Sequence, residues 1–426
     1  MIHKKFKHLK TIEGISEYEL KANGLRVLYK QVEGTEVITT NITYLVGARD
    51  ESVGETGVAH MLEHMLFKPT KQDKKNKHEA SSMKFEREVG AILNANTWKD
   101  RTTYYFSYGK EHFTRVLKLE AERMRDVLLT DAEFQPERTN VLSEFDMYNG
   151  EPEFALSVAM VATAFHSHPY GHETIGFRED IERYTVEKLQ RFYNHFYRPN
   201  NATLMVVGDV DLKTALDKIA EAFGDLKSEP GVKIRPEVVE PKQEGVRRVE
   251  IVRPGTKNLL AFGVKHGGFP TEEWFESMLA LKLLAGGSDS LLQKALVDTG
   301  LASSVTYAQE PTKDNNLGML TITLSSKIDH QEMEKVVLAL IAEVKADWLQ
   351  KHLKTAVTKA INSELFARDS SLDIVAELTE YVASGNWSAY FETEATLRKI
   401  TVKRIQNCLV KMFTPESLTI GIYKSI

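Results

Sequence analysis

The segment 57–67, Gly-Val-Ala-His-Met-Leu-Glu-His-Met-Leu-Phe, places two histidines and a glutamate in an apolar setting. In an α-helix four residues advance the chain by about 400°, so His60 and His64 would lie about 40° apart on one face. Glu63 would lie one turn from His60, near the same face. Two imidazoles at this spacing can bind one divalent metal ion, and the glutamate is then free to act on water. A surface helix with solvated side chains is the alternative, and the spacing alone does not decide between them.

Length, composition and charge limit the classes of protein to consider. At 426 residues the chain exceeds an ordinary single core, so two or more domains are expected. An apolar fraction of 42% and a charged fraction of 27% are typical of a soluble globular protein. The net charge of −5, with both signs mixed along the chain, argues against a nucleic-acid binder that depends on phosphate contacts.

Cysteine usage and hydropathy indicate the compartment. Cys408 is the only cysteine, which excludes an intrachain disulfide and a zinc site built on cysteines. The basic segment 1–8 is followed by polar sequence and lacks the apolar core of a signal peptide. No run of 18 apolar residues is present, so no membrane span is expected. We therefore expect a cytoplasmic protein.

The hydrophobic pattern of the first half predicts both strands and helices. The lysine-rich segment 68–84 has no clear period and predicts a loop. Elsewhere in this half we expect strands at 18–21, 25–29, 37–46, 93–97, 102–108 and 202–208, and helices at 57–67, 111–129 and 137–148.

The same order of elements recurs after a segment rich in Pro, Glu, Lys and Gly. We therefore predict an α+β fold of two homologous halves, each a mostly antiparallel β-sheet covered by α-helices. The predicted division is an N-terminal metal-binding half 1–228, a linker 229–246 and a C-terminal half 247–426. In the place of the His60 helix the second half has 278–284, without histidine or glutamate, so only the first half can bind metal in this way. The second half is expected to hold strands at 249–252, 258–264, 317–324 and 418–423, a helix at 272–284, and helices within 331–385.

Two histidines leave a zinc ion short of the three protein ligands usual in catalytic sites. With no cysteine nearby, the third ligand must be Asp, Glu or His. Glu137 and Glu144 lie seven residues apart, hence two turns apart on one face of a helix. One could bind the metal while the other supports the site. A solvated acidic helix face is the alternative explanation of the same spacing.

The pattern H-x-x-E-H, followed about 80 residues later by E-x6-E, resembles that of the inverzincin peptidases, the pitrilysin-like family. That family includes insulin-degrading enzyme, the mitochondrial processing peptidase, and many bacterial members of about this length. The resemblance covers the first half and extends to its fold, the pitrilysin/LuxS-like type of metallohydrolase. The matching segments are 59–67, Asn-Ala-x-Thr-x-x-Asp-x-Thr-x-Tyr at 94–104, 168–181, and Tyr-Arg-Pro-Asn-Asn-Ala at 197–202.

The resemblance implies a role for each candidate residue. It implies that His60, His64 and Glu144 hold one zinc ion per chain. Glu63 would be the general base and Glu137 a supporting catalytic carboxylate. The implied activity is that of a zinc-dependent endopeptidase acting on peptides or unfolded polypeptide segments inside a clamshell chamber.

The same resemblance predicts where the substrate lies. An extended peptide would add a strand along the segment Asn94, Ala95, Asn96 and Thr97 by backbone pairing. Such pairing reads little sequence, so specificity would come from pockets and from the shape of the chamber.

The second half departs from the family pattern at two positions. The family commonly carries an Arg and a Tyr seven residues apart that hold substrate and help to stabilise the oxyanion. Here the two positions are Leu296 and Ser303, within an otherwise similar Gly-Leu-Ala frame. We therefore expect a heterodimer with a paralogous subunit that supplies the pair, with a homodimer as the alternative. Tyr307 is a candidate substitute for the missing Tyr.

Two other interpretations of the sequence remain. Proteins of this fold include zinc-free scaffold subunits, so a non-catalytic scaffold or peptide-binding subunit is the alternative function. The histidines of 166–172 could suggest a second metal site, but we interpret that segment as structural because only Glu173 is near at ligand spacing.

Overall fold

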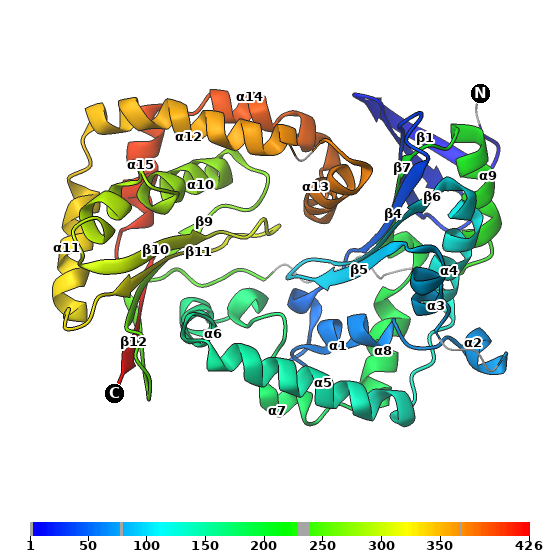
Figure 1. Cartoon of the computed structure of the whole chain (residues 1–426), viewed down its shortest axis with the longest axis horizontal. Coiled ribbons are helices and arrows are strands. Elements are labelled where there is room, and N and C mark those ends of the chain that lie inside the picture. Colours follow the sequence, from blue (N-terminus) through cyan, green and yellow to red (C-terminus); the bar gives the residue numbers. More distant parts are fainter. Residues whose placement is uncertain (1–2, 77–79, 229–237, 367) are drawn as a thin grey trace. The chain divides into compact units, whose positions relative to one another are not determined.

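The computed structural model describes residues 3–76, 80–228, 238–366 and 368–426 (Figure 1). Their internal contacts divide the chain into two units, which we describe separately. Unit 1 contains Met1–Phe145, Glu173–Glu237 and Ala367–Ser388, and unit 2 contains Asp146–His172, Val238–Phe366 and Ala389–Ile426. Half of the predicted linker, 229–237, lies outside the described residues, and 238–246 has no regular secondary structure.

Unit 1 is built on a seven-stranded sheet in the order β1-β2-β3-β7-β4-β6-β5. The β3–β7 pair is parallel, whereas the other neighbouring strands are antiparallel. Strand β1 was not predicted from the sequence, because its alternation is interrupted by exposed basic residues. The strands are β1 (Phe6–Ile12), β2 (Ile15–Leu20), β3 (Arg26–Gln31), β4 (Val37–Tyr44), β5 (Ile92–Thr97), β6 (Thr102–Gly109) and β7 (Ala202–Gly208).

Unit 2 contains a five-stranded sheet in the order β10-β11-β9-β12-β8. It repeats the order β5-β6-β4-β7-β3 of unit 1, including the single parallel pair, here β8–β12. This repetition confirms the predicted α+β fold of two similarly built, mostly antiparallel sheets. The strands are β8 (Arg247–Arg253), β9 (Leu259–His266), β10 (Ala302–Ala308), β11 (Asn316–Leu324) and β12 (Leu418–Ser425).

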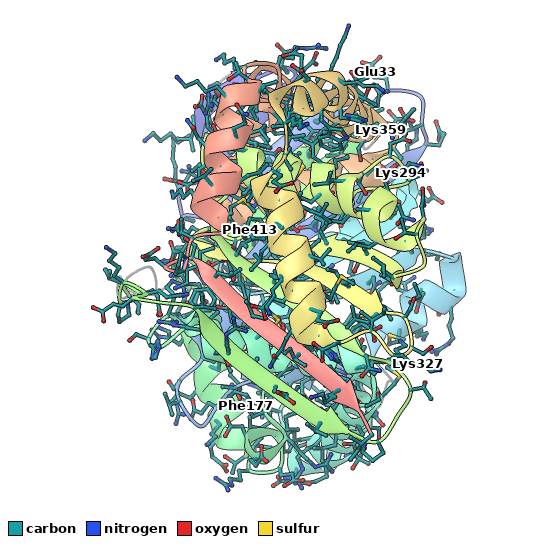
Figure 2. All side chains as sticks on the ribbon, turned by 90° about the vertical axis from the view of Figure 1, so that its left-hand side faces the viewer. Glu33, Phe177, Lys294, Lys327, Lys359 and Phe413 are labelled. Atoms are coloured by element: carbon teal, nitrogen blue, oxygen red, sulfur yellow. The ribbon has the colours of Figure 1, made fainter. Side chains whose placement is uncertain are left out.

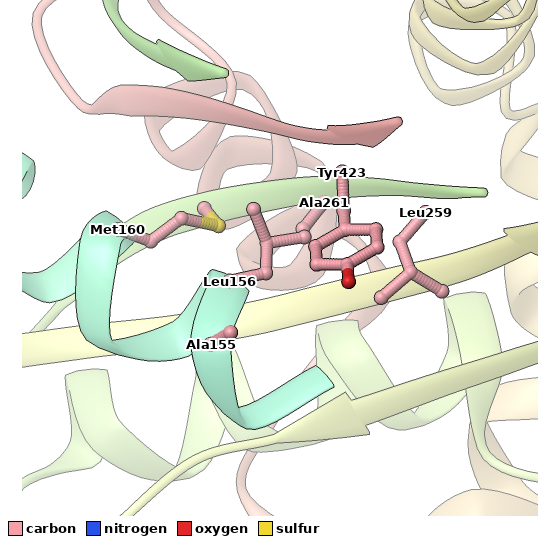
Figure 3. Close-up of a cluster of buried hydrophobic side chains, with 6 residues drawn as sticks. All are labelled: Ala155, Leu156, Met160, Leu259, Ala261 and Tyr423. Atoms are coloured by element: carbon pink, nitrogen blue, oxygen red, sulfur yellow. The ribbon is translucent and has the colours of Figure 1, made fainter. Parts of the chain in front are cut away.

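One helix of each half of the sequence belongs to the unit built mainly from the other half. Helix α6 (Pro152–Ala164) packs on β8, β9 and β12 of unit 2, and α13 (Ser371–Ser384) packs on β4 and β7 of unit 1. The apolar side of α6 explains its place, since Leu156 and Met160 are buried beside Tyr423 (Figure 3). A Cβ on Gly421 would lie 2.6 Å from the Met160 sulfur, so the strand needs glycine there. The compact units therefore do not coincide with the predicted halves 1–228 and 247–426.

Two predicted boundaries were wrong. The segment predicted as a loop at 68–84 contains α2 (Lys71–Lys75) and the start of α3 (Ser81–Val89), and 77–79 lie outside the described residues. The missed signal is a capping box, in which the Thr70 hydroxyl accepts a hydrogen bond from the Asp73 amide. Helix α5 (Asp131–Gly150) starts before Pro136 because acidic residues in its first turn favour an earlier start.

The remaining helices cover the two sheets (Figure 1). Exposed charged side chains such as Lys294, Lys327 and Lys359 project from unit 2 (Figure 2). In the described part of the chain, no helix is both long enough and apolar enough to cross a membrane. The other α-helices are α1 (Val58–Met65), α4 (Phe113–Arg125), α7 (Arg178–Ile181), α8 (Val186–Phe196), α9 (Leu212–Phe223), α10 (Glu272–Ala285), α11 (His330–Ala342), α12 (Ala346–Phe366), α14 (Thr393–Arg398) and α15 (Val402–Met412). Short helical turns are η1 (Ala48–Asp50), η2 (Lys110–His112), η3 (Pro169–Gly171), η4 (Pro199–Asn201), η5 (Gln293–Val297) and η6 (Trp387–Phe391).

Candidate metal centre

Helix α1 carries the two histidines and is fixed at its N-terminus. Its apolar residues are buried, and the helix packs against β5, β6 and α8 of unit 1. Gly57 precedes it with φ of +88°, and a Cβ there would lie 2.3 Å from the Ile175 carbonyl oxygen. The Glu51 carboxylate accepts hydrogen bonds from the amides of Gly57 (2.7 Å) and Ala59 (2.8 Å). These bonds occupy amides at a helix start that has no side-chain cap of its own.

Helix α5 brings the distant glutamates to the same place. Glu144 Oε2 lies 3.6 Å from His64 Nε2 and 3.9 Å from His60 Nε2. The two Nε2 atoms lie 3.3 Å apart, so both imidazoles direct the same nitrogen at one point. Within the described part of the chain, His60, His64 and Glu144 are the one group of metal-ligating residues whose ligand atoms all lie within 4.8 Å of one another.

This donor set fits a zinc ion. Two ligands bound at about 2.0–2.1 Å in a tetrahedral site stand about 3.3–3.4 Å apart, which is the separation of the two histidine nitrogens. Two imidazoles and one carboxylate form a three-ligand set of the type found in catalytic zinc sites. All three side chains remain partly exposed, at 14% for His60, 25% for His64 and 24% for Glu144, so water and substrate can reach them.

Glu137 contacts His64 at Nδ1, the ring nitrogen opposite the one that faces His60 and Glu144. Glu137 Oε1 lies 2.9 Å from His64 Nδ1, while Oε2 contacts the Lys68 ammonium and accepts a hydrogen bond from the Asn140 amide at 3.3 Å. The hydrogen bond from His64, together with Lys68, lowers the pKa of Glu137 to about 2. As a carboxylate, Glu137 holds the proton of His64 on Nδ1, which leaves Nε2 free as a ligand. Sequence analysis missed Lys68, whose role depends on tertiary packing.

The two histidines differ in their electrostatics. Burial lowers the pKa of His60 to about 3, and the neighbouring His64 adds to this effect. Burial also acts to lower the pKa of His64, but the hydrogen bond to Glu137 and nearby carboxylates raise it overall. His60 is therefore neutral at ordinary pH, the form that binds metal. Among the described residues, none forms a hydrogen bond with its buried Nδ1.

Glu63 lies beside the ligands in a buried position. Its side chain is held by the Thr97 hydroxyl, which donates a hydrogen bond of 2.6 Å to Glu63 Oε2. Burial raises the pKa of Glu63, and the bond from Thr97 partly opposes this rise. The second oxygen, Oε1, is left to accept a proton. Such a carboxylate beside a metal site is suited to general-base chemistry.

The predicted substrate strand is β5, at the end of the unit 1 sheet. It pairs with β6 on one side, and no strand of the described sheet pairs with its other edge. Ala95 and Thr97 are buried, whereas Asn94 is exposed and Asn96 half-buried. Thr97 therefore contacts Glu63 through its side chain, a role that the strand prediction did not include. Peptide pairing along β5 stays a prediction.

Arg101 is a second residue that the sequence analysis did not identify. Its side chain is buried and contacts the Asn96 amide oxygen and the Glu380 carboxylate of α13. Because Asn96 belongs to β5, this contact fixes the edge strand from the side of α13. Nothing in the local sequence pairs residue 101 with residue 380.

At the other sites raised by the sequence, the described residues form no further group of possible metal ligands. Leu296 is fully buried in η5 and Ser303 is exposed on β10. In the histidine-rich segment 166–172, His168 Nδ1 accepts a hydrogen bond from the Tyr170 amide, which gives it a local structural role. Tyr307 lies on β10, where burial raises its pKa.

Family comparisons match the chain along most of its length. The family described as "Insulinase (Peptidase family M16)" matches residues 26–177, and the family described as "Peptidase M16 inactive domain" matches residues 183–359. The first match includes every residue of the candidate metal centre.

Individual relatives that are named zinc proteases also match most of the chain. The chain is 31% identical over 328 residues to a protein of Helicobacter pylori named zinc protease PqqE, with 76% of this chain and 73% of that protein covered. It is 24% identical over 420 residues to the uncharacterized zinc protease YmfH of Bacillus subtilis, with 97% and 95% covered. The crystal structure of a protease from Helicobacter pylori matches with a TM-score of 0.87 and 27% identity, covering 99% of both chains.

Proposed function

Because the chain belongs to the M16 family of peptidases, the pitrilysin-like family, we propose that it is a zinc-dependent endopeptidase. The observation that carries this proposal is the convergence of His60, His64 and Glu144 on one point, with the free oxygen of Glu63 nearby. The substrate class would be peptides or unfolded polypeptide segments, since β5 offers an edge for an extended chain.

In this proposal His60, His64 and Glu144 would hold the zinc ion. When bound, zinc acts as a Lewis acid that polarises the peptide carbonyl and makes water more acidic. Glu63 Oε1 takes one proton from the attacking water, whose oxygen forms the new bond to the carbonyl carbon. Glu63 then passes that proton to the amide nitrogen as the carbon–nitrogen bond breaks. The products are a carboxylic acid and an amine, so atoms and charges balance.

The supporting residues act by orientation. Thr97 holds the Glu63 carboxylate through Oε2, which keeps Oε1 available for the proton. Glu137 orients the His64 ring through Nδ1, and Lys68 with Asn140 fixes Glu137 in turn. Such supporting partners hold the reacting groups in the geometry that the reaction needs.

The variant Glu63→Gln tests the proposal. It keeps the size of the side chain and all three ligands, but it cannot accept the proton from water. We expect zinc content to be unchanged and hydrolysis of an unstructured fluorogenic peptide to fall by about 10²–10⁴-fold. Glu33→Gln is the matched control, because Glu33 is exposed on the surface (Figure 2) and should leave both quantities unchanged. Full activity in Glu63→Gln would overturn the proposed role.

We further propose that the active assembly is a heterodimer with a paralogous subunit that supplies an Arg and a Tyr. The support is that this chain has Leu296 and Ser303 where the family commonly has that pair. We expect the purified chain alone to cleave peptides much more slowly than when it is combined with such a subunit. A homodimer with full activity would contradict this proposal and leave the peptidase assignment intact.

The alternative function is a non-catalytic scaffold or peptide-binding subunit of the same fold. The description of the second matching family as an inactive domain is the observation that favours it. Metal analysis of the purified chain separates a zinc-free scaffold from an enzyme. If zinc is bound but native protein and Glu63→Gln bind peptide equally without turnover, the chain is a peptide-binding subunit.

A further inference from the structure

Unit 2 contains a cavity of about 320 Å³, formed by α12 with the C-terminal end of α10 and the turn after it. Three lysines and two aromatic side chains form part of its wall. Lys282 comes from α10, while Trp348, Lys351, His352 and Lys359 come from α12 (Lys359 is labelled in Figure 2). None of these residues belongs to the candidate metal centre.

Within the described ranges, the three lysines of this cavity have no acidic partner. Among the residues that the structure describes, no carboxylate oxygen lies within 4.0 Å of Lys282, Lys351 or Lys359. Asp289 also lines the cavity but forms no ion pair with them, and Asp347 stands four residues before Lys351 without pairing to it. Elsewhere in unit 2 a Lys and an Asp four residues apart do form an ion pair, as Lys294 and Asp298 do at 2.9 Å.

Of the three lysines of the cavity, Lys282 is the one whose positive charge is most destabilised by its surroundings. It is half-buried, and burial together with the nearby Lys359 lowers its pKa. The positive charges of Lys282 and Lys359 repel each other, and a bound anion would offset that repulsion. The three ammonium groups and the one carboxylate of Asp289 leave two net positive charges around the cavity.

An aromatic wall lies along the same cavity. The rings of Trp348 and His352 are stacked, with centroids 4.2 Å apart and planes inclined by 22°. His352 Nδ1 lies 2.8 Å from the Trp348 carbonyl oxygen, a contact that fixes the imidazole. A rigid ring pair of this kind gives a flat surface on which a planar group can pack.

We propose that this cavity binds a small organic phosphate, a phosphate monoester that carries an aromatic ring. The two net positive charges match a phosphate dianion, and lysine ammonium groups bind phosphate as point charges. The ring of the ligand would pack against the Trp348–His352 wall. The proposal does not depend on the peptidase activity, since it uses no residue of the metal centre.

Phenyl phosphate is a suitable probe for the full chain at low ionic strength. Calorimetry should show saturable binding with one site per chain, accompanied by a change in tryptophan fluorescence that Trp348→Phe removes. Benzenesulfonate, which has the same ring but one negative charge, should bind at least about tenfold more weakly because it lacks the second charge. Equal binding of the two compounds, or no saturable binding of phenyl phosphate, would overturn the proposal.

Lysine variants locate the site. Lys351→Gln and Lys359→Gln should each weaken binding of phenyl phosphate by about two- to fivefold, the range expected for exposed charge pairs. The triple variant with Lys282→Gln should weaken it by more than about tenfold. Lys354→Gln, exposed on the same helix but outside the cavity, is the matched control and should change nothing. An equal loss in Lys354→Gln would mean a diffuse charge effect and contradict the site. If the triple variant does not fold, the two exposed single variants decide.

Discussion

Helices α1 and α10 follow corresponding strands of two similarly ordered sheets, yet they bury very different side chains. Helix α1 holds His60, Glu63 and His64 against partners from α5 and β5. The buried positions of α10 are apolar apart from Ser277, whose hydroxyl donates within its own helix. The same arrangement of strands therefore accommodates either a polar site or a plain core. Function depends on whether neighbouring elements provide partners for buried polar groups.

The strongest test of this contrast between α1 and α10 removes Glu144, the α5 residue that lies near both histidines of α1. We expect Glu144→Ala to lower zinc affinity by more than about 100-fold, because loss of a direct ligand should exceed the 10–100-fold cost of losing a supporting residue. Peptidase activity at limiting zinc should be lost with the metal. Competition against a chromogenic chelator measures the affinity directly. Glu151→Ala serves as the control, since this residue is exposed and precedes α6. Unchanged zinc affinity in Glu144→Ala would show that α5 does not contribute a ligand.

Part of this site could be predicted from sequence because its geometry is local. The spacing of His60 and His64 fixes their common face once a helix forms, and the structure places both nitrogens 3.3 Å apart. The place of Glu144 could not be derived in that way, since the packing of α5 near α1 is tertiary. It entered through the family resemblance. The bond from Thr97 to Glu63 escaped prediction for the same reason.

The fold, like the site, could be predicted where it depends on local sequence and could not be predicted where it depends on tertiary packing. Repetition of strand and helix patterns was enough to predict two similarly built α+β halves, because the hydrophobic periodicity that indicates each strand and helix is local. The placement of α6 and α13 was not predicted. Their sequences show which face is apolar but do not specify which sheet will cover it.

Substitutions in these two helices test the difference between sequence halves and compact units. Leu156→Ala in α6 and Leu378→Ala in α13 each remove a side chain that is at most 2% exposed. Each should destabilise the protein by about 2–5 kcal/mol, the usual cost of such a cavity. Hydrogen exchange followed by mass spectrometry should then show faster exchange in β8, β9 and β12 for Leu156→Ala.

For Leu378→Ala the faster exchange should appear in β4 and β7 instead. Val336→Ala in α11 is a control in which a 41% exposed apolar side chain is shortened, and it should change exchange little. If Leu156→Ala loosened β4 and β7 to the same extent as β8 and β12, the units would not be separate in stability.

Each unit contains a buried histidine with a strongly depressed pKa, about 3 for His60 and about 4 for His266, and burial also lowers the pKa of His330 in unit 2. For His266 the main cause is burial, and the Gly267 carbonyl opposes it. Because the unfolded value is about 6.5, the unfolded chain binds the proton first, and stability is lost as pH falls from about 6.5 towards 4. From pH 7.5 to 5.0 the metal-free chain should lose about 2 kcal/mol more than His266→Leu does.

Denaturant unfolding of metal-free protein at the two pH values measures this loss. His352→Leu is the control, since it removes a half-buried histidine of the same unit by the same substitution. An identical pH dependence in native protein and His266→Leu would mean that His266 is not held neutral. Metal-free protein is needed because protons would compete with zinc at the proposed ligands His60 and His64.

The smallest expected effect concerns how the two helices begin. Helix α10 starts with a side-chain cap, in which the Thr271 hydroxyl accepts a hydrogen bond of 3.2 Å from the Trp274 amide. Helix α1 has no such cap, and Glu51 from outside the helix accepts from its first amides instead. Thr271→Ala should therefore cost about 1 kcal/mol of stability, and Thr271→Ser should restore most of it, since serine caps equally well. Zinc affinity should stay unchanged in both variants. A fall in zinc affinity in Thr271→Ala would show that the start of α10 is coupled to the candidate metal centre. That result would contradict the conclusion that α1 carries the site while α10 only forms core.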